Sequence, residues 1–204
     1  MGRMALLDMD GVLFDYEVQL RKDLSELASE WEKENYNLDE VSIWDLEKQH
    51  AWMKARIDLI KKQPGWWRNL PKYLPGWEVY QVAEKIGFCT EILTKGPRSK
   101  PLASSEKQEC IAIHFGEDHP PVNVVGKNKS RYYGRVLVDD YPEYVAGWLE
   151  HRPRGLAIMP LHSYNKRFLH ANVLHYDGQN LEEVERCLQA AYDRGSGEHW
   201  RDRL

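Results

Sequence analysis

The sequence lacks any run of 18 or more apolar residues, so nothing in it predicts a membrane-spanning helix. It also lacks the start of a secretory signal peptide, because its first apolar segment leads at once into two aspartates, Asp8 and Asp10. These two absences predict a soluble, cytoplasmic protein that has no membrane partner.

Cysteine is scarce in this chain. Cys89, Cys110 and Cys187 lie far apart, and none of them belongs to a CxxC pair. This pattern favours buried thiols in a reducing compartment over a disulfide framework or a zinc site. The eight histidines show no HxH or HxxxH spacing, so we interpret them as surface or hydrogen-bonded core residues and not as metal ligands.

An excess of positive charge is missing as well. The 28 lysines and arginines are outnumbered by 32 aspartates and glutamates, which gives a formal net charge of -4. Such a chain has no general basic field to hold a nucleic-acid backbone, so we expect no polynucleotide partner. A local site for one small anion is compatible with this charge. The length of 204 residues, with 42% hydrophobic residues, suits one globular domain or a core with a modest insertion.

What the sequence does contain is a series of short apolar runs, each followed by turn residues. They resemble continuous buried strands more than alternating ones, which favours a parallel sheet covered on both faces. The segments between them carry helix formers with apolar positions three or four apart. We therefore predict an α/β, Rossmann-like core whose ligand sites lie at the carboxyl ends of strands. The predicted strands are 4–7, 88–93, 122–125, 135–138, 156–159 and 173–176, and the predicted helices are 100–116, 142–151 and 180–193.

Residues 15–87 interrupt this alternation. The interval is too long for one crossover and contains no convincing strand. Apolar residues form one helical stripe over 16–34 and another over 45–62. We interpret 15–87 as a small helical cap seated over the strand ends, and 1–14 together with 88–204 as the core.

The most informative motif is Asp8, Met9, Asp10 and Gly11, directly after the first predicted strand. Side chains alternate along an extended segment, which places Asp8 and Asp10 on one side and turns Met9 toward the body of the protein. One carboxylate could then attack phosphorus while the other transfers the proton, and a shared Mg2+ would offset the negative charges. The alternative is a polar loop after a buried strand, without a chemical role.

Three more polar signals follow predicted strands, in the order Thr94, Lys129 and the pair Asp139 and Asp140. Because the carboxyl ends of parallel strands meet at one sheet edge, we expect these residues beside the two aspartates of the motif. Each signal alone has a structural explanation: the acidic pair, for example, could cap the helix that follows. Lys127 is an alternative to Lys129, but the ordered coincidence of all the signals is stronger than any one of them.

The complete set resembles the haloacid dehalogenase (HAD) superfamily of phosphohydrolases, whose pattern is DxDx[TV], then Ser or Thr, then Lys, then a paired or spaced acid. The phrases DMDGVLFDYE, LPGWEVYQVAEK and VLVDDYPEYV are most similar to the 5'(3')-deoxyribonucleotidase branch. The resemblance covers the whole core and implies a parallel sheet flanked by helices, with the insertion in the position of a helical cap. It also favours Lys129 over Lys127, because the interval from Lys129 to Asp139 resembles that branch. The chain departs from the branch where Lys95 and Gly96 replace a small residue and a proline, which adds positive charge near the phosphate.

The resemblance implies a role for each residue of the set. Asp8 would be the nucleophile that forms an aspartyl phosphate, and Asp10 would be the general acid and then the general base. Thr94 would bind the phosphate. Lys95 departs from the branch pattern, and we expect its positive charge to assist phosphate binding. Lys129 would neutralise charge on Asp8 and on the transferring phosphoryl group.

Magnesium is the implied cofactor. Asp8, Asp139, Asp140 and the backbone carbonyl of Asp10 would supply oxygen ligands, which are the ligands that Mg2+ prefers. Of the adjacent pair, Asp140 is favoured as the direct ligand.

Aromatic residues of the insertion are candidates to contact the substrate. Trp66 and Trp67 lie in the segment where related nucleotidases place aromatic rings against the base. We expect one of the two rings to be buried and the other to face the substrate, and the alternative is that both build the core of the insertion. Asn165 and Ser163, beyond the predicted strand 156–159, are candidates to bind substrate or to orient the acidic pair.

Together these features predict a Mg2+-dependent phosphomonoester hydrolase that acts on a nucleoside monophosphate, with a 5'(3')-deoxyribonucleotide favoured. The same chemistry on another small phosphate ester, such as a sugar phosphate, is an alternative because core motifs do not fix the substrate. A catalytically silent binding module is a second alternative, which the intact residue set argues against. The oligomeric state is open, with a homodimer as one alternative.

Overall fold

The computed structural model of the protein describes residues 2–36, 51–97 and 100–204. Contacts within the chain divide it into two compact units. The first unit comprises Met1–Phe14, Lys72–Lys95 and Pro120–Leu204, and the second comprises Asp15–Pro71 and Gly96–His119. In the described ranges, no helix is both long enough and apolar enough to cross a membrane.

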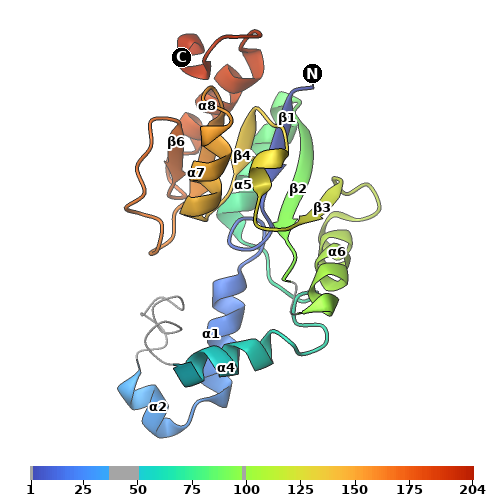
Figure 1. Cartoon of the computed structure of the whole chain (residues 1–204), viewed down its shortest axis with the longest axis vertical. Coiled ribbons are helices and arrows are strands. Elements are labelled where there is room, and N and C mark those ends of the chain that lie inside the picture. Colours follow the sequence, from blue (N-terminus) through green and yellow to red (C-terminus); the bar gives the residue numbers. More distant parts are fainter. Residues whose placement is uncertain (1, 37–50, 98–99) are drawn as a thin grey trace. The chain divides into compact units, whose positions relative to one another are not determined.

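The first unit is built on a six-stranded sheet in the order β3-β2-β1-β4-β5-β6, in which every neighbouring pair is parallel (Figure 1). The strands are β1 (Met4–Leu7), β2 (Cys89–Lys95), β3 (Val122–Val125), β4 (Val136–Val138), β5 (Leu156–Pro160) and β6 (Val173–Tyr176). Both β4 and β5 are buried along their whole length, as continuous apolar runs of a covered parallel sheet should be. The α/β, Rossmann-like fold predicted from the sequence is confirmed.

The strand order changes direction at β1. On one side of this strand lie β2 and then β3, and on the other side lie β4, β5 and β6 in that order. Leu7, the last residue of β1, is paired with Ile92 of β2 and Val138 of β4, so the carboxyl ends of these three strands lie together. In open parallel sheets a ligand site forms at such a switch point.

Helices cover both faces of the sheet. On one face, α7 (Pro142–Glu150) packs beside η1 (Lys129–Arg131), and its Val145 and Trp148 join a buried cluster with alternate strand residues such as Leu137. The strand residues between these point to the opposite face. There α5 (Leu74–Ile86) and α8 (Leu181–Asp193) pack against each other and against the sheet.

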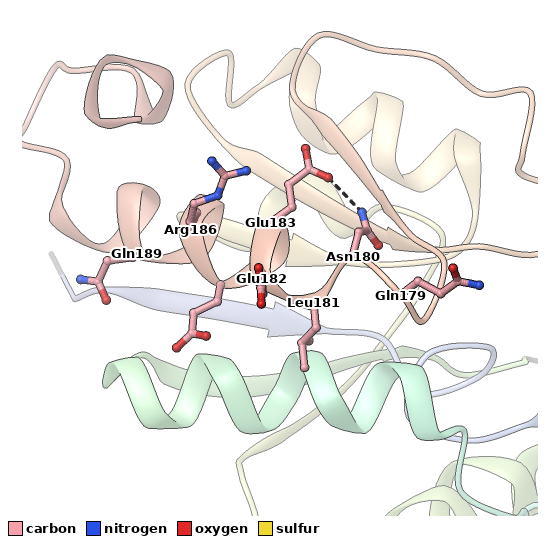
Figure 2. Close-up of a pocket in the computed structure, with 8 residues that line it drawn as sticks. Gln179, Asn180, Leu181, Glu182, Glu183, Arg186 and Gln189 are labelled. Atoms are coloured by element: carbon pink, nitrogen blue, oxygen red, sulfur yellow. Dashed lines mark hydrogen bonds between the residues drawn. The ribbon is translucent and has the colours of Figure 1, made fainter.

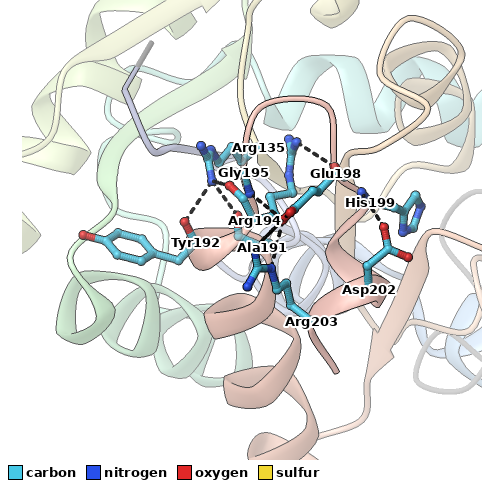
Figure 3. Close-up of polar contacts among 9 residues, drawn as sticks. All are labelled: Arg135, Ala191, Tyr192, Arg194, Gly195, Glu198, His199, Asp202 and Arg203. Carbon is cyan, nitrogen blue, oxygen red and sulfur yellow. Dashed lines mark hydrogen bonds and ion pairs between the residues drawn. The ribbon is translucent and has the colours of Figure 1, made fainter.

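The end of α8 is tied to the residue before β4, as Figure 3 shows. Arg135 donates from Nη1 to three backbone carbonyls, those of Ala191 at 3.1 Å, Tyr192 at 2.8 Å and Arg194 at 2.7 Å. The last carbonyls of a helix have no intrahelical partner, and a cation near them also interacts favourably with the negative end of the helix dipole. The short helix η2 (Trp200–Arg203) follows and buries Trp200.

The second unit contains helices α1 (Tyr16–Leu27), α2 (Glu30–Asn35), α4 (Ala51–Ile60) and α6 (Pro101–Phe115). Glu106 joins α6 to the segment after α4, because its carboxylate accepts from the N–H of Gly65 at 2.6 Å and of Trp67 at 3.2 Å. Thus α6 belongs to the second unit although its residues fall in the range predicted for the core. Conversely, α5 belongs to the first unit although its residues fall in the range predicted for the cap. The role of the second unit as a cap stays a prediction.

One expectation for the insertion is wrong, because the stripe over 16–34 forms two helices and not one. Ser29 starts a new helix: its Oγ accepts from Glu32 N–H at 3.2 Å, and Glu32 Oε2 accepts from Ser29 N–H at 2.7 Å. This reciprocal capping ends the stripe, so Trp31 beyond it is exposed. The stripe over 45–62 corresponds to α4, and residues 45–50 lie outside the described residues.

Candidate active site

The Asp8 motif forms a tight turn directly after β1. The N–H of Asp8 donates to the carbonyl oxygen of Val138 at 2.8 Å, so the pairing with β4 continues past the strand end. The chain then folds back, with the N–H of Leu13 donating to the carbonyl oxygen of Met9 at 2.9 Å. Met9 is fully buried, as predicted. Gly11 has a φ of 73°, in the left-handed region that glycine adopts without strain.

The start of α5 holds this turn in place. The N–H of Tyr73 and the indole N–H of Trp77 both donate to the carbonyl oxygen of Leu13, at 2.9 and 2.8 Å. Gly76 lies so close to the turn that an ideal Cβ there would be 1.7 Å from the carbonyl oxygen of Val12. Only glycine permits this approach of two backbones. The LPGW segment therefore fixes the loop that carries Asp8.

Lys129 brings the first and the last motifs together. It begins η1, and only 1% of its surface is exposed. Its Nζ lies 2.8 Å from Asp8 Oδ2 and 2.7 Å from Asp139 Oδ2. Burial by itself would lower the pKa of Lys129, but the charges of Asp139 and Asp8 outweigh burial and raise this pKa above its ordinary value. Lys127, the alternative, is exposed.

Three carboxylates meet beside this lysine. Asp8, Asp139 and Asp140 are all buried, and each offers an oxygen that lies within 4.8 Å of those of the other two. Burial raises the pKa of Asp139 and of Asp140, and the negative charge of Asp8 acts on both in the same direction. Three acids and one lysine leave a negative charge that a bound cation would neutralise.

The donor set of this cluster fits a hard divalent cation such as Mg2+. Its members are carboxylates, and oxygen ligands are what Mg2+ prefers, whereas zinc favours nitrogen and sulfur. Asp139 has both oxygens engaged, because Oδ1 accepts from Tyr141 N–H at 2.9 Å and Oδ2 pairs with Lys129. The hydroxyl of Tyr164 donates to one oxygen of Asp140, Oδ2. Contacts with protein donors thus involve both oxygens of Asp139, whereas the Tyr164 contact involves one oxygen of Asp140. This comparison favours Asp140 as the direct ligand, and that role stays a prediction.

The other predicted phosphate and proton-transfer residues lie at the same sheet edge. Thr94 and Lys95 are the last two residues of β2; Thr94 is buried and Lys95 is half-buried. The strand extends beyond its predicted end because these two residues pair with Val124 and Val125 of β3. Asp10 is half-buried in the turn after β1, and its carboxylate is not one of the three in the cluster. The actions of these residues on a phosphate stay predictions.

Asn165 is fully buried and contacts the backbone of Asp140. Its Nδ2 donates to the carbonyl oxygens of Asp140 and Pro160, both at 2.9 Å, and its Oδ1 accepts from the N–H of His162 at 2.8 Å. These bonds engage both ends of its amide within the protein. Of the two roles predicted for Asn165, the geometry therefore favours orienting the acidic pair.

Trp66 and Trp67 lie in the second unit, where their exposed fractions are 7% and 5%. Tyr16 meets Trp66 edge-on and stacks on Trp67, with ring centroids 5.6 and 5.9 Å apart. The indole N–H of Trp66 donates to Asp23 Oδ2 at 2.6 Å, and that of Trp67 donates to the carbonyl oxygen of Lys61 at 3.0 Å. The expectation that only one ring would be buried is wrong, because both build the core of this unit. Contact of either ring with a substrate stays a prediction.

Two solved structures share this architecture over nearly their whole length. A protein of Burkholderia xenovorans LB400, described as a putative haloacid dehalogenase-like hydrolase, matches with a TM-score of 0.54 at 12% identity, over 94% of this chain and 98% of its own. A HAD family hydrolase of Deinococcus radiodurans R1, with bound phosphate and sodium, matches with a TM-score of 0.51 at 14% identity, over 93% of this chain and 96% of its own. The chain has the haloacid dehalogenase-like fold.

Comparison of sequences adds two relatives from Bordetella. Proteins of Bordetella pertussis strain Tohama I and Bordetella bronchiseptica strain RB50 are each named "Putative 5'(3')-deoxyribonucleotidase". Each is 23% identical over 145 residues, which are 68% of this chain and 74% of the relative. No protein-family model matches the sequence. The likeness agrees with the branch that the motifs resemble.

The sequence-based prediction missed two residues of the HAD-like core, Tyr164 and His162. The hydroxyl of Tyr164 reaches Asp140, and His162 Nε2 lies 2.7 Å from the carbonyl oxygen of Gly11. A signal was available, because polar and aromatic residues follow directly on β5, the strand next to β4. From this loop the prediction names Ser163 and Asn165, and neither Tyr164 nor His162.

A surface hollow of the HAD-like core lies elsewhere, along the start of α8 (Figure 2). It has a volume of about 890 Å³, and its charged lining consists of Arg186 and three glutamates, Glu182, Glu183 and Glu185. An acidic lining repels an anionic ester, so this hollow is a poor site for a phosphate. The buried Lys129 and the three carboxylates at the sheet edge favour that edge over this hollow as the candidate site.

Proposed function

We propose that the protein is a Mg2+-dependent phosphomonoester hydrolase of the HAD superfamily that acts on a nucleoside monophosphate. The observation that carries this proposal is the buried Lys129, paired with both Asp8 and Asp139 at the carboxyl ends of strands in a haloacid dehalogenase-like fold. Burying charged groups is costly, and such clusters occur where a site needs them. The phosphate bound in the Deinococcus radiodurans protein of this fold supports the same class of ligand.

Asp8 is the proposed nucleophile. Its carboxylate is held at both oxygens, since Oδ1 accepts from the N–H of Met9 at 2.8 Å and Oδ2 pairs with Lys129. A carboxylate oxygen of Asp8 attacks phosphorus, the phosphorus–oxygen bond of the ester breaks, and the leaving oxygen takes a proton from Asp10. Water then attacks phosphorus in the aspartyl phosphate and gives its proton to Asp10. Inorganic phosphate leaves, and the carboxylate of Asp8 is restored.

The other residues stabilise charge during these two steps. Lys129 neutralises charge on Asp8 and on the transferring phosphoryl group, and Thr94 and Lys95 bind phosphoryl oxygens. Asp8, Asp139 and Asp140 would hold Mg2+, together with the backbone carbonyl of Asp10. When bound, Mg2+ supplies positive charge that offsets the acids and the phosphate.

Two substrate classes are candidates. The likeness to the two Bordetella proteins supports a nucleoside monophosphate, with a 5'(3')-deoxyribonucleotide favoured. Burial of Trp66 and Trp67 favours the second class, another small phosphate ester such as a sugar phosphate, because buried rings are not free to stack on a base.

A phosphate-release panel tests the proposal and separates these classes. Ribo- and deoxyribonucleoside monophosphates, sugar phosphates and p-nitrophenyl phosphate are assayed with Mg2+ and with EDTA. We expect release that requires Mg2+ and is fastest with a deoxyribonucleoside monophosphate. Fastest release from a sugar phosphate would replace the substrate class and keep the chemistry, and no release from any ester would refute the proposal.

The variant Asp8→Asn tests the assigned nucleophile. It keeps the size of the side chain but removes the attacking charge, so we expect loss of turnover with an unchanged fold by circular dichroism. Asp118→Asn is the control, because it removes an exposed acid from the loop after α6 and should keep full activity. Mg2+-dependent activity retained in Asp8→Asn would refute the role of Asp8.

A further inference from the structure

The loop after β5 confines the carboxylate of Asp140 from two sides. The hydroxyl of Tyr164 donates to Asp140 Oδ2. Gly11 lies against the same oxygen, because an ideal Cβ at Gly11 would be 2.4 Å from Asp140 Oδ2 and 3.2 Å from the hydroxyl oxygen of Tyr164. The missing side chain of Gly11 thus leaves room for this oxygen, and the Tyr164 hydroxyl fixes it there.

The ring of Tyr164 is itself held by a row of stacked rings. It lies nearly parallel to His162, at 7° with centroids 5.0 Å apart, and Tyr73 stacks on His162 with centroids 4.9 Å apart. His162 Nε2 lies 2.7 Å from the carbonyl oxygen of Gly11, which ties the row to the turn after β1. Stacking and this polar contact restrict the positions open to the Tyr164 hydroxyl.

We infer that Tyr164 is a positioning residue for the metal site, because it fixes the plane in which Asp140 presents its oxygens to the cation. This inference rests on the proposed function, since it takes Asp140 as a ligand of Mg2+. A carboxylate with one oxygen fixed offers its remaining lone pairs in one orientation, whereas a free carboxylate must be ordered when the cation binds. Partners that orient metal ligands in this way typically account for about 10- to 100-fold in metal affinity.

Calorimetric titration with Mg2+ in the absence of substrate tests the inference. Tyr164→Phe keeps the stacked ring and removes the hydroxyl, so we expect it to bind Mg2+ at least about tenfold more weakly than the unaltered protein. The matched control is Tyr176→Phe, which removes a tyrosine hydroxyl that donates to Glu78 Oε2, and Glu78 is not one of the three carboxylates of the cluster. The control should bind Mg2+ with unchanged affinity. In activity assays, Tyr164→Phe should need about tenfold more Mg2+ for half-maximal rate and regain most of its rate at saturation.

The possible results separate this inference from the proposed function. If the unaltered protein binds Mg2+ and Tyr164→Phe binds it equally well, Tyr164 does not position the metal site, and the proposed function stands. If the unaltered protein and an Asp140→Asn variant both fail to bind Mg2+, the metal site of the proposed function is refuted and the inference fails with it. If Tyr164→Phe does not fold, Tyr164→His and Tyr164→Leu are compared, and the inference requires tighter binding by the variant whose ring can still donate a hydrogen bond.

Discussion

Replacing Lys129 by methionine should destabilise the protein by about 3–5 kcal/mol, the usual cost of removing one partner from a buried ion pair. Lys129 Nζ lies 2.8 Å from Asp8 and 2.7 Å from Asp139, and both acids are buried. Methionine fills a similar volume, so the loss comes from the charge and its hydrogen bonds. The variant leaves negative charge buried without its counter-ion, which is more costly than the absence of the pair.

Urea unfolding in EDTA, followed by circular dichroism, measures this cost. With a slope of about 1–3 kcal/mol per molar urea, the midpoint should fall by roughly 1–5 M. A second variant tests the cause: Lys129→Met combined with Asp139→Asn should recover part of the lost stability, because the added substitution removes one of the buried charges. A Lys129→Met protein as stable as the unaltered one, or a double variant less stable than Lys129→Met, would contradict the reasoning.

Two further predictions concern the acids and the turn. The pKa of Asp139 and of Asp140 is raised in the folded protein, so the stability they contribute is full below about pH 4 and is lost as pH rises through about pH 7. Mg2+ should therefore raise the melting temperature more at neutral pH than at pH values near 5, and an equal effect at both would contradict this. Gly11→Ala should cost about 1–3 kcal/mol and abolish Mg2+ binding, since its Cβ would be 2.4 Å from Asp140 Oδ2 at a left-handed φ. Gly147→Ala in α7, where a Cβ meets nothing within 4 Å, is the matched control for calorimetry and thermal melts, and Mg2+ binding by Gly11→Ala would count against the tight fit.

The sheet could be predicted closely because buried parallel strands have continuous apolar runs in their sequence. The predicted strands at 122–125 and 173–176 coincide with β3 and β6. The helical insertion was harder to predict because local capping contacts set where its helices begin and end, and contacts between distant segments set which helices pack together. Ser29 ends a stripe by capping a new helix, and Glu106 bonds to backbone groups of a segment far away in the sequence.

The core of the candidate site could be predicted for a related reason. Asp8, Lys129 and the acidic pair after β4 each follow a strand, so topology alone brings them to one edge. Tyr164 could not be assigned in this way, because its role depends on the ring row with His162 and Tyr73 and on the space left by Gly11. The polar and aromatic residues after β5 mark the loop as a candidate, but the contacts themselves join three separate segments, and no local pattern specifies which residues meet.

The central claim is that Asp8 carries the phosphoryl group between the two steps. Acid quenching during turnover, followed by mass spectrometry of peptides, tests it directly. The mechanism predicts a phosphoryl group on the peptide that contains Asp8, present with substrate and Mg2+ and absent in Asp8→Asn. Steady release of phosphate by a protein whose Asp8 peptide is never phosphorylated would contradict the claim.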